Sequence, residues 1–197
     1  MYIRKAKFEE LDCIMDIYAH ARAFMAETGN PKQWGATNWP PQSLIEQDIA
    51  QGKCHVCCVD EGSSAQIVGV FYYDFGYDID ATYRNITDGV WISDAPYGVV
   101  HRIASDGSTK GVGTFCIEWA FAQCGHLRID THRDNLIMQN LMRKLGFKQC
   151  GTIYVVEDND PRIAYEKIKI ILHEKKSCCH SFVRKMIAAL FALNLFY

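Results

Sequence analysis

The stretch Val99-Val100-His101-Arg102-Ile103-Ala104, followed by Ser108-Thr109-Lys110-Gly111-Val112-Gly113, decides the fold of this chain. The first run is rich in valine and predicts a strand over 97–105. The glycine turn over 106–113 opens directly into an apolar helix that extends to Cys124. A helix start leaves backbone N–H groups unpaired and partly positive, and glycines let a ligand approach closely. The stretch therefore predicts a strand, loop and helix that hold phosphate oxygens.

The elements predicted around this stretch alternate between strands and helices. Downstream, strands are expected over 127–131, 148–157 and 162–168, with a helix over 135–145 that ends at Gly146. Upstream, a strand over 2–6 precedes helices over 9–27 and 41–50 and paired strands over 54–60 and 66–75. The strand–helix alternation across 97–157 indicates an α/β fold.

Three motifs stand in a fixed order after the strand: Gly111-Val112-Gly113, then Asn135, then Gly146-Phe147. In order and spacing they resemble the acetyl-CoA signature of the GNAT superfamily of N-acetyltransferases. The resemblance covers roughly residues 1–168 and is strongest over 97–168. It implies one GNAT domain over 1–168, with a mixed, V-splayed central sheet of about seven strands flanked by helices.

The resemblance also implies an enzyme that moves acetyl from acetyl-CoA, its co-substrate, to the primary amine of a small molecule by direct attack in a ternary complex. In such folds the pantetheine arm lies against the splayed strand as an added strand would. The implied cofactor-binding residues are Ile103, Ala104, Ser105, Lys110, Gly111, Val112, Gly113, Thr114, Asn135, Met138 and Arg143. For Arg143, a solvated helix face is the competing interpretation.

Two positions depart from the family pattern. Ser108 stands where the loop usually starts with Gln or Arg, and Met142 stands where many relatives have a tyrosine that protonates the leaving thiolate. The general acid is therefore open between Tyr154, His132 and a bound water. The missing tyrosine also leaves room for a non-catalytic acyl-CoA-binding module. Acetylation of a protein amine is a further alternative.

His101 is the first candidate for the general base. It lies on the strand that lines the expected cleft, and a free histidine has a pKa of about 6.5. The competing interpretation is a hydrogen-bonded core histidine. Asp88 and Asp134 are alternative bases, although Asp134 also suits a helix cap. A backbone N–H near Ile103 or Ala104 is the expected donor to the thioester oxygen.

Aromatic and acidic residues suggest the acceptor pocket. Trp34, Trp39 and Trp91, together with Asp78 and Asp80, would attract a small cationic amine by charge and by cation–π contact. The alternative is a solvated loop with a few core aromatics.

Composition narrows the function class. Formal net charge is −2 and no long basic run is present, which argues against nucleic-acid binding. Nine cysteines without an apolar leader indicate reduced thiols and a cytoplasmic protein. Cys54 and Cys57 should point to opposite faces of a strand, so no metal is expected, although Cys178-Cys179-His180 offers a partial second ligand group.

The last segment, 169–197, lies outside the resemblance and is expected to be a basic, apolar and helical tail. Its apolar run over 186–197 would extend only ~18 Å as a helix, against ~30 Å of bilayer hydrocarbon. Integral membrane insertion is therefore not expected. Docking on the domain, pairing in a homodimer and peripheral membrane contact remain open.

Overall fold

The computed structural model describes residues 1–35, 37–61, 64–156 and 159–169. One mixed sheet of eight strands organises this part of the chain, in the order β1-β2-β3-β5-β6-β8-β7-β4. The strands are β1 (Tyr2–Lys5), β2 (Cys54–Glu61), β3 (Ser64–Gly76), β4 (Ile86–Thr87), β5 (Tyr97–Ser105), β6 (His126–His132), β7 (Lys148–Tyr154) and β8 (Pro161–Ile168). The helices are α1 (Leu11–Glu27), α2 (Gln42–Ala50), α3 (Val112–Cys124) and α4 (Leu136–Lys144), with 3-10 turns η1 (Phe8–Glu10) and η2 (Ala81–Arg84).

The expected mixed sheet flanked by helices is confirmed, with one strand more than the seven expected. The additional strand, β4, has only two residues and pairs with β7 at the edge of the sheet. Two residues cannot show an alternating pattern, and the surrounding segment is polar, so no local pattern indicates a strand there.

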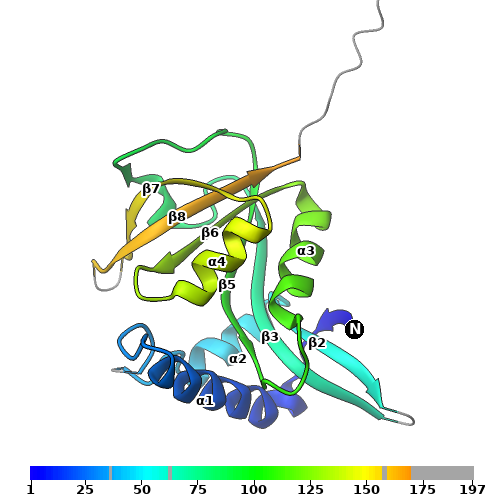
Figure 1. Ribbon diagram of the computed structural model, residues 1–197. Helices are drawn as coiled ribbons and strands as arrows, with labels where there is room; N and C mark the ends of the chain where they lie inside the picture. Colours follow the sequence, from blue (N-terminus) through cyan, green and yellow to red (C-terminus); the bar gives the residue numbers. More distant parts are fainter. Residues whose placement is uncertain (36, 62–63, 157–158, 170–197) are drawn as a thin grey trace, which may run out of the picture.

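Helices cover both sides of the sheet (Figure 1). Ile14, Ile17, Tyr18 and Ala21 repeat at helical spacing on α1 and join α2 and β2 in one core. On the other face α3 and α4 form a second core, in which Val112, Cys116 and Met142 are almost fully buried. The site described below lies where these two halves separate.

The sheet splits between β5 and β6. These two strands run parallel but pair only at Gly98↔Leu127 and Val99↔Arg128. Beyond Val99, β5 stays paired with β3 on its other side as far as Ser105. The edge of β5 that faces β6 is therefore left without strand partners, which is the V-shaped splay expected from the resemblance.

A β-bulge distorts β5 at the start of this open edge. Val70 pairs with Ala104 and Tyr72 with His101, so two residues of β5 oppose one of β3. Arg102 adopts a left-handed φ of 51°, which is uncommon for a residue other than glycine. Neighbouring residues of a regular strand point to opposite faces, yet His101 and Arg102 both contact the ring of Tyr72. The bulge thus brings both side chains to one side of the sheet.

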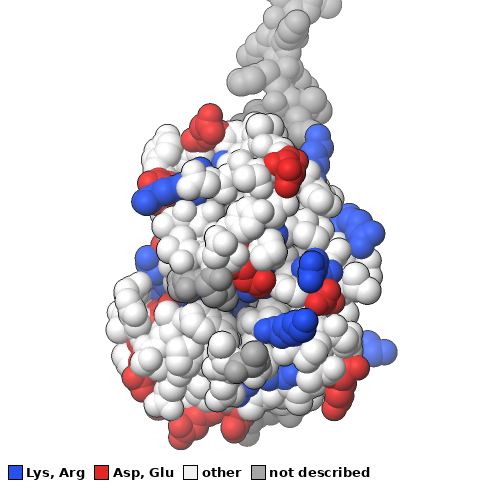
Figure 2. Space-filling model, turned by 90° about the vertical axis from the view of Figure 1, so that its left-hand side faces the viewer, with Lys and Arg blue, Asp and Glu red and all other residues white. Residues whose placement is uncertain are grey.

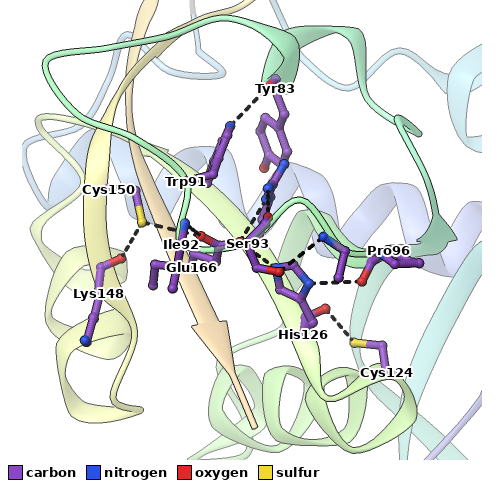
Figure 3. Close-up of polar contacts among 12 residues, drawn as sticks. Tyr83, Trp91, Ile92, Ser93, Pro96, Cys124, His126, Lys148, Cys150 and Glu166 are labelled. Atoms are coloured by element: carbon purple, nitrogen blue, oxygen red, sulfur yellow. Dashed lines mark hydrogen bonds and ion pairs between the residues drawn. The ribbon is translucent and has the colours of Figure 1, made fainter. Parts of the chain in front are cut away.

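A buried polar cluster fixes the segment that leads into β5 (Figure 3). Glu166, fully buried on β8, accepts hydrogen bonds from the backbone N–H of Ile92 and from Arg128 Nε, and pairs with His126 Nε2 at 2.5 Å. Arg128 also donates to the Ser93 carbonyl. We call Glu166, His126 and Arg128 the buried triad. Through these hydrogen bonds the buried triad holds the irregular segment around Ile92 and Ser93 against β6 and β8.

Cys54 and Cys57 belong to different cores, as the alternation of a strand predicts, because Cys54 packs with α1 and α2 and Cys57 packs with α3. Among the described residues no group of three His, Cys, Asp or Glu side chains is placed to hold a metal ion. No helix in these ranges is long and apolar enough to cross a membrane. The Cys178-Cys179-His180 group and nearly all of the proposed 169–197 tail lie outside the described residues.

Candidate active site

A cavity of about 1060 Å³ occupies the mouth of the splay. Its walls come from both sides of the V: the bulged half of β5 on one side, and the end of β6 with the start of α4 on the other. The loop between α1 and α2 supplies a third wall, which includes Gln33, Trp34 and Trp39. Ligand sites are often concave, mostly apolar clefts with a few convergent polar groups, and this cavity has that form.

Charged side chains converge on the cavity from several elements. Four carboxylates (Asp48, Asp80, Asp130, Asp134) and two guanidinium groups (Arg102, Arg162) line it, together with His101. By contrast, Figure 2 shows a face of the molecule on which acidic and basic side chains are interspersed over a largely uncharged surface.

His101 pairs with a carboxylate inside the cavity. Its Nε2 lies 2.8 Å from Asp80 Oδ2, and its Nδ1 lies 3.8 Å from Asp130 Oδ1. The short contact assigns the ring proton of the neutral form to Nε2, since a carboxylate only accepts. Nδ1 then carries the lone pair, and about one fifth of the side chain is exposed. The geometry is that of an oriented general base.

Asp80 is fixed as well as paired. Its Oδ1 accepts the Thr82 N–H, which caps η2. Burial alone would raise the pKa of Asp80, but the hydrogen bond and charge of His101, together with the hydrogen bonds from Thr82, hold that pKa below its ordinary value. Asp80 is thus anionic at neutral pH and orients the imidazole, a more specific arrangement than the charge attraction expected from the sequence.

Asp130 is the second carboxylate beside the imidazole. Its Oδ1 accepts the hydroxyl of Tyr83 at 2.8 Å, and its Oδ2 lies 3.9 Å from Arg162 Nε. Tyr83 is buried, and burial together with the charge of Asp130 raises its pKa well above the ordinary value. Tyr83 therefore acts as a neutral donor that fixes Asp130.

Arg102 lies next to His101 and is held by a different acid. Its Nη2 donates to Asp48 Oδ2 at 2.6 Å, and its Cζ lies 4.6 Å from the Tyr72 ring centroid. Burial raises the pKa of Asp48 in spite of the guanidinium. Arg102 Nε is buried and has no hydrogen-bond partner among the described residues.

The start of α3 fits a diphosphate group. Gly111 caps the helix with a φ of 83° and makes no side-chain cap bond, so the first N–H groups of the helix lack that partner. A Cβ placed on Gly111 would meet nothing within 4 Å, which leaves open space at the helix mouth. Ser108, which replaces the usual Gln or Arg, bonds Asp106 through both its amide and its hydroxyl and shapes the loop. The chemistry of this loop therefore suits the phosphates of acetyl-CoA.

Two further features of the cavity suit the remainder of acetyl-CoA. Ile103, Ala104 and Ser105 line the cavity along the unpaired edge of β5, where an extended pantetheine arm can accept or donate backbone hydrogen bonds. Thr131 Oγ1 on β6 is buried, lines the cavity and has no hydrogen-bond partner within the described ranges. A buried hydroxyl left in this way is available to a ligand.

Asn135 and Gln33 connect the two walls of the cavity. Asn135 Oδ1 accepts the Met138 N–H and caps α4, while its Nδ2 donates to Gln33 Oε1 at 3.0 Å. Gln33 Oε1 also accepts from Asn30 Nδ2. The α1–α2 loop is thereby fastened to the start of α4, and the predicted cofactor residue Asn135 has its amide occupied in this structure.

The predicted cofactor residues divide into two groups. The cavity is lined by Ile103, Ala104, Ser105, Gly113, Asn135 and Met138. The residues Lys110, Gly111, Val112, Thr114 and Arg143 are not part of its lining. Val112 is buried in the core, and Arg143 is exposed and donates to Asn140, as the solvated-face interpretation describes. The main-chain role of 110–114 at the helix mouth stays a prediction, and so does a contact of Arg143 with an outer phosphate.

The predicted acceptor residues also divide. Trp34, Trp39 and Asp80 line the cavity. Asp78 lies outside the lining because its side chain is exposed and pairs with Arg84 at 2.8 Å. Trp91 lies outside it too, since its indole donates to the Tyr83 carbonyl and packs under Arg128. Neither side chain lines the cavity in this structure, and the contact of Asp78 and Trp91 with an acceptor stays a prediction.

The candidate acids lie away from the cavity lining. Met142 is fully buried in the core with α3, so the tyrosine position of relatives is here a packing position. Tyr154 is exposed at the end of β7. His132 is buried, its Nδ1 accepts the Asp134 N–H, and burial with the charge of Arg162 lowers its pKa. Neither Tyr154 nor His132 lines the cavity.

Several residues of the cavity are not indicated by the sequence, and four of them carry polar groups close to His101 or Arg102. Asp48, Tyr72, Arg102 and Asp130 come from four separate elements. Arg102 is the one most open to detection, because it follows His101 in the decisive strand. A regular strand would turn it to the other face, and no sequence signal reports the bulge.

Comparison with known proteins agrees with this fold. No family model matches the sequence, and no curated protein matches it. Among solved structures, a GNAT-family acetyltransferase from Streptococcus agalactiae is 30% identical, with a TM-score of 0.75 over 86% of this chain and 95% of that one. A putative acetyltransferase from Staphylococcus aureus shares the fold at 23% identity and a TM-score of 0.58, over 86% of this chain and 100% of that one. A ribosomal-protein-alanine N-acetyltransferase from Brucella melitensis shares it at 18% identity and a TM-score of 0.54, over 85% and 99%.

The first of these relatives carries the assignment, because it combines 30% identity with a match over nearly the whole length of both chains. The chain belongs to the GNAT family of acetyltransferases.

Proposed function

We propose that this acetyltransferase uses acetyl-CoA to acetylate the primary amine of a small molecule, with His101 as general base. The observation that carries the proposal is the His101–Asp80 pair inside a cavity that runs along the open edge of β5 to the mouth of α3. A cavity closed on one side by Trp34 and Trp39 suits a compact acceptor.

Acetyl-CoA supplies an acetyl thioester at the open edge of β5. The acceptor arrives as an ammonium ion, since an alkylamine has a pKa near 10, and must lose a proton before it can attack. His101 Nδ1 takes this proton, directly or through one water, while Asp80 holds Nε2–H and stabilises the imidazolium. The nitrogen lone pair then forms the C–N bond, the C–S bond breaks, and its electron pair leaves on sulfur. The nitrogen releases its second proton to the departing thiolate or to water, which leaves a neutral amide.

Two further groups complete the step. A backbone N–H on the open edge of β5, at Ile103 or Ala104, would donate to the carbonyl oxygen as negative charge develops there. A thiol has a pKa of about 8.5, so the thiolate is a competent leaving group near neutral pH without an enzyme acid. This chemistry removes the need for a tyrosine at Met142.

The test is a transfer assay. Purified protein with acetyl-CoA is offered a panel of amines, amino acids and peptides, and both free thiol and acetylated product are measured. We expect stoichiometric thiol and product with at least one small amine. Binding of acetyl-CoA in calorimetry without transfer to any member of the panel would instead favour the non-catalytic acyl-CoA-binding module. Turnover confined to peptides would favour the protein-amine alternative.

A further inference from the structure

The bulge in β5 sets a guanidinium beside the general base, and the proposed function has no use for it. His101 and Arg102 are consecutive, yet both contact the Tyr72 ring, with His101 at 5.8 Å between ring centroids and Arg102 Cζ at 4.6 Å from the centroid. Arg102 adopts left-handed backbone angles to reach this position. Such strain in a residue other than glycine is found most often where a side chain must be aimed for function.

Two contacts hold the Arg102 guanidinium in place but do not use all of its N–H donors. Asp48 on α2 engages Nη2 from one side, and the Tyr72 ring covers one face of the guanidinium. A guanidinium has five N–H donors, and here the N–H at Nε is buried without a partner in the described part of the chain. The side chain is 14% exposed and lines the cavity. Native proteins rarely leave a buried donor unpaired unless a ligand or water satisfies it.

The charges around His101 have the opposite sign. Asp130 Oδ1 lies 3.8 Å from the basic nitrogen of His101, and Asp80 lies on its other side. An ammonium group is attracted to this pair of carboxylates before His101 takes its proton. The cavity therefore offers anionic groups where the amine must sit and a cationic fork next to it.

We infer that the acceptor is a small amino acid-like molecule, whose amine lies at His101 and whose carboxylate is bound by Arg102. This inference rests on the proposed function and names the substrate class of the same site. Arginine is the side chain best shaped for a carboxylate, because its planar fork matches the two oxygens. Tyr72, Trp34 and Trp39 leave apolar surface for the acceptor's own side chain.

The experiment compares acceptors that differ only at the carboxyl group. Wild-type protein receives L-phenylalanine, L-leucine and their carboxamides, and kcat/KM is measured for each with acetyl-CoA. We expect the acids to exceed the amides by roughly 10- to 100-fold, the range of a charge-assisted hydrogen bond. The amine of an amide is less basic and more often neutral, so a preference for the acid must come from the protein.

Arg102→Gln should reduce the acid-to-amide ratio to near one, and Arg102→Lys should restore part of it. The ratio is taken within one preparation, so it does not depend on the fraction of protein that folds. The matched control is Arg84→Gln, since Arg84 is an exposed arginine that pairs with Asp78 outside the cavity. It should leave the ratio unchanged.

Binding separates this inference from the proposed function. Calorimetry with the same acids and amides, in the presence of CoA, reports the carboxylate site without turnover. Acid binding that needs Arg102, in a protein that acetylates nothing, would sustain the inference and reject the proposed function. Equal rates or equal binding for acids and amides would overturn the inference, and so would a ratio that Arg102→Gln leaves unchanged.

Discussion

Two histidines on the same sheet pair with carboxylates and have different surroundings. His101 pairs with Asp80 at 2.8 Å beside the cavity, and both side chains are about one fifth exposed. His126 pairs with Glu166 at 2.5 Å, and these two side chains are 7% and 0% exposed. A sequence shows only a histidine and an acid in each case, so the surroundings decide what each pair does.

The free ring nitrogen is the chemical difference. His126 uses both nitrogens, Nδ1 on the Pro96 carbonyl and Nε2 on Glu166, and Arg128 donates to the same carboxylate. His101 uses Nε2 on Asp80 and keeps Nδ1 within a cavity. A histidine with both ring nitrogens bonded, such as His126, holds a segment of chain in place. A histidine with one free ring nitrogen, such as His101, can take up a proton.

The first prediction tests this comparison by removing the free ring nitrogen, His101 Nδ1. His101→Gln keeps a polar group of similar size but cannot accept a proton at pH 7. We expect kcat/KM for the acceptor to fall by about 10²- to 10⁴-fold, the usual contribution of general-base catalysis. The limb of the pH profile on the acid side, which reports protonation of the base, should disappear with it.

The control for that variant is His20→Gln, because His20 also lines the cavity and no ion pair is seen for it in the described residues. It should retain the pH limb. An acid limb that survives in His101→Gln would remove His101 from the mechanism and return Asp134 to consideration.

The second prediction concerns the buried triad. Glu166→Gln leaves Arg128 and His126 without a carboxylate in the interior, which typically costs about 3–5 kcal/mol of unfolding free energy. We expect the lower end, about 3 kcal/mol, because the amide keeps one accepting oxygen. Activity per folded molecule should stay close to wild type. Chemical denaturation and an active-site titration measure the two quantities separately.

The loss of stability in Glu166→Gln should also depend on pH. Burial alone would raise the pKa of Glu166, but the bonds from His126, the Ile92 amide and Arg128 lower it below the ordinary 4.5. A carboxyl with a lowered native pKa contributes stability that is fully present above its unfolded pKa and is lost as pH falls through the native one. The stability gap between wild type and Glu166→Gln should therefore be constant from pH 7 to about 5 and shrink below 4.5. Asp78→Asn, an exposed partner of Arg84, should show little gap at any pH.

Much of the fold follows from local sequence patterns. The helical spacing on α1, the glycine turn before α3 and the Gly146 stop of α4 are each encoded within a few residues. The splay is implied by family resemblance, and it is realised because β5 and β6 pair at only two positions. The short strand β4 lacks any local pattern, so it is absent from the elements that the sequence predicts.

The site is less predictable, because it depends on side-chain directions set by distant pairing. His101, Asp80, Trp34 and Trp39 are expected at the cavity and lie there. Asp78 and Asp80 are two residues apart and look equivalent in sequence, yet one reaches Arg84 and the other reaches His101. Arg102 faces the cavity only because of a bulge that no residue type announces.

The third prediction concerns Asp80, the carboxylate that pairs with His101. Asp80→Asn replaces a charge-assisted hydrogen bond to His101, and it allows the ring to turn or to adopt the other tautomer. The loss of one such bond, about 1.5–3 kcal/mol, corresponds to a decrease in kcat/KM of roughly 10- to 100-fold. This is smaller than the effect of His101→Gln because the base itself remains. A decrease that comes from a higher KM, with kcat unchanged, would mean that Asp80 contacts the acceptor rather than orienting His101.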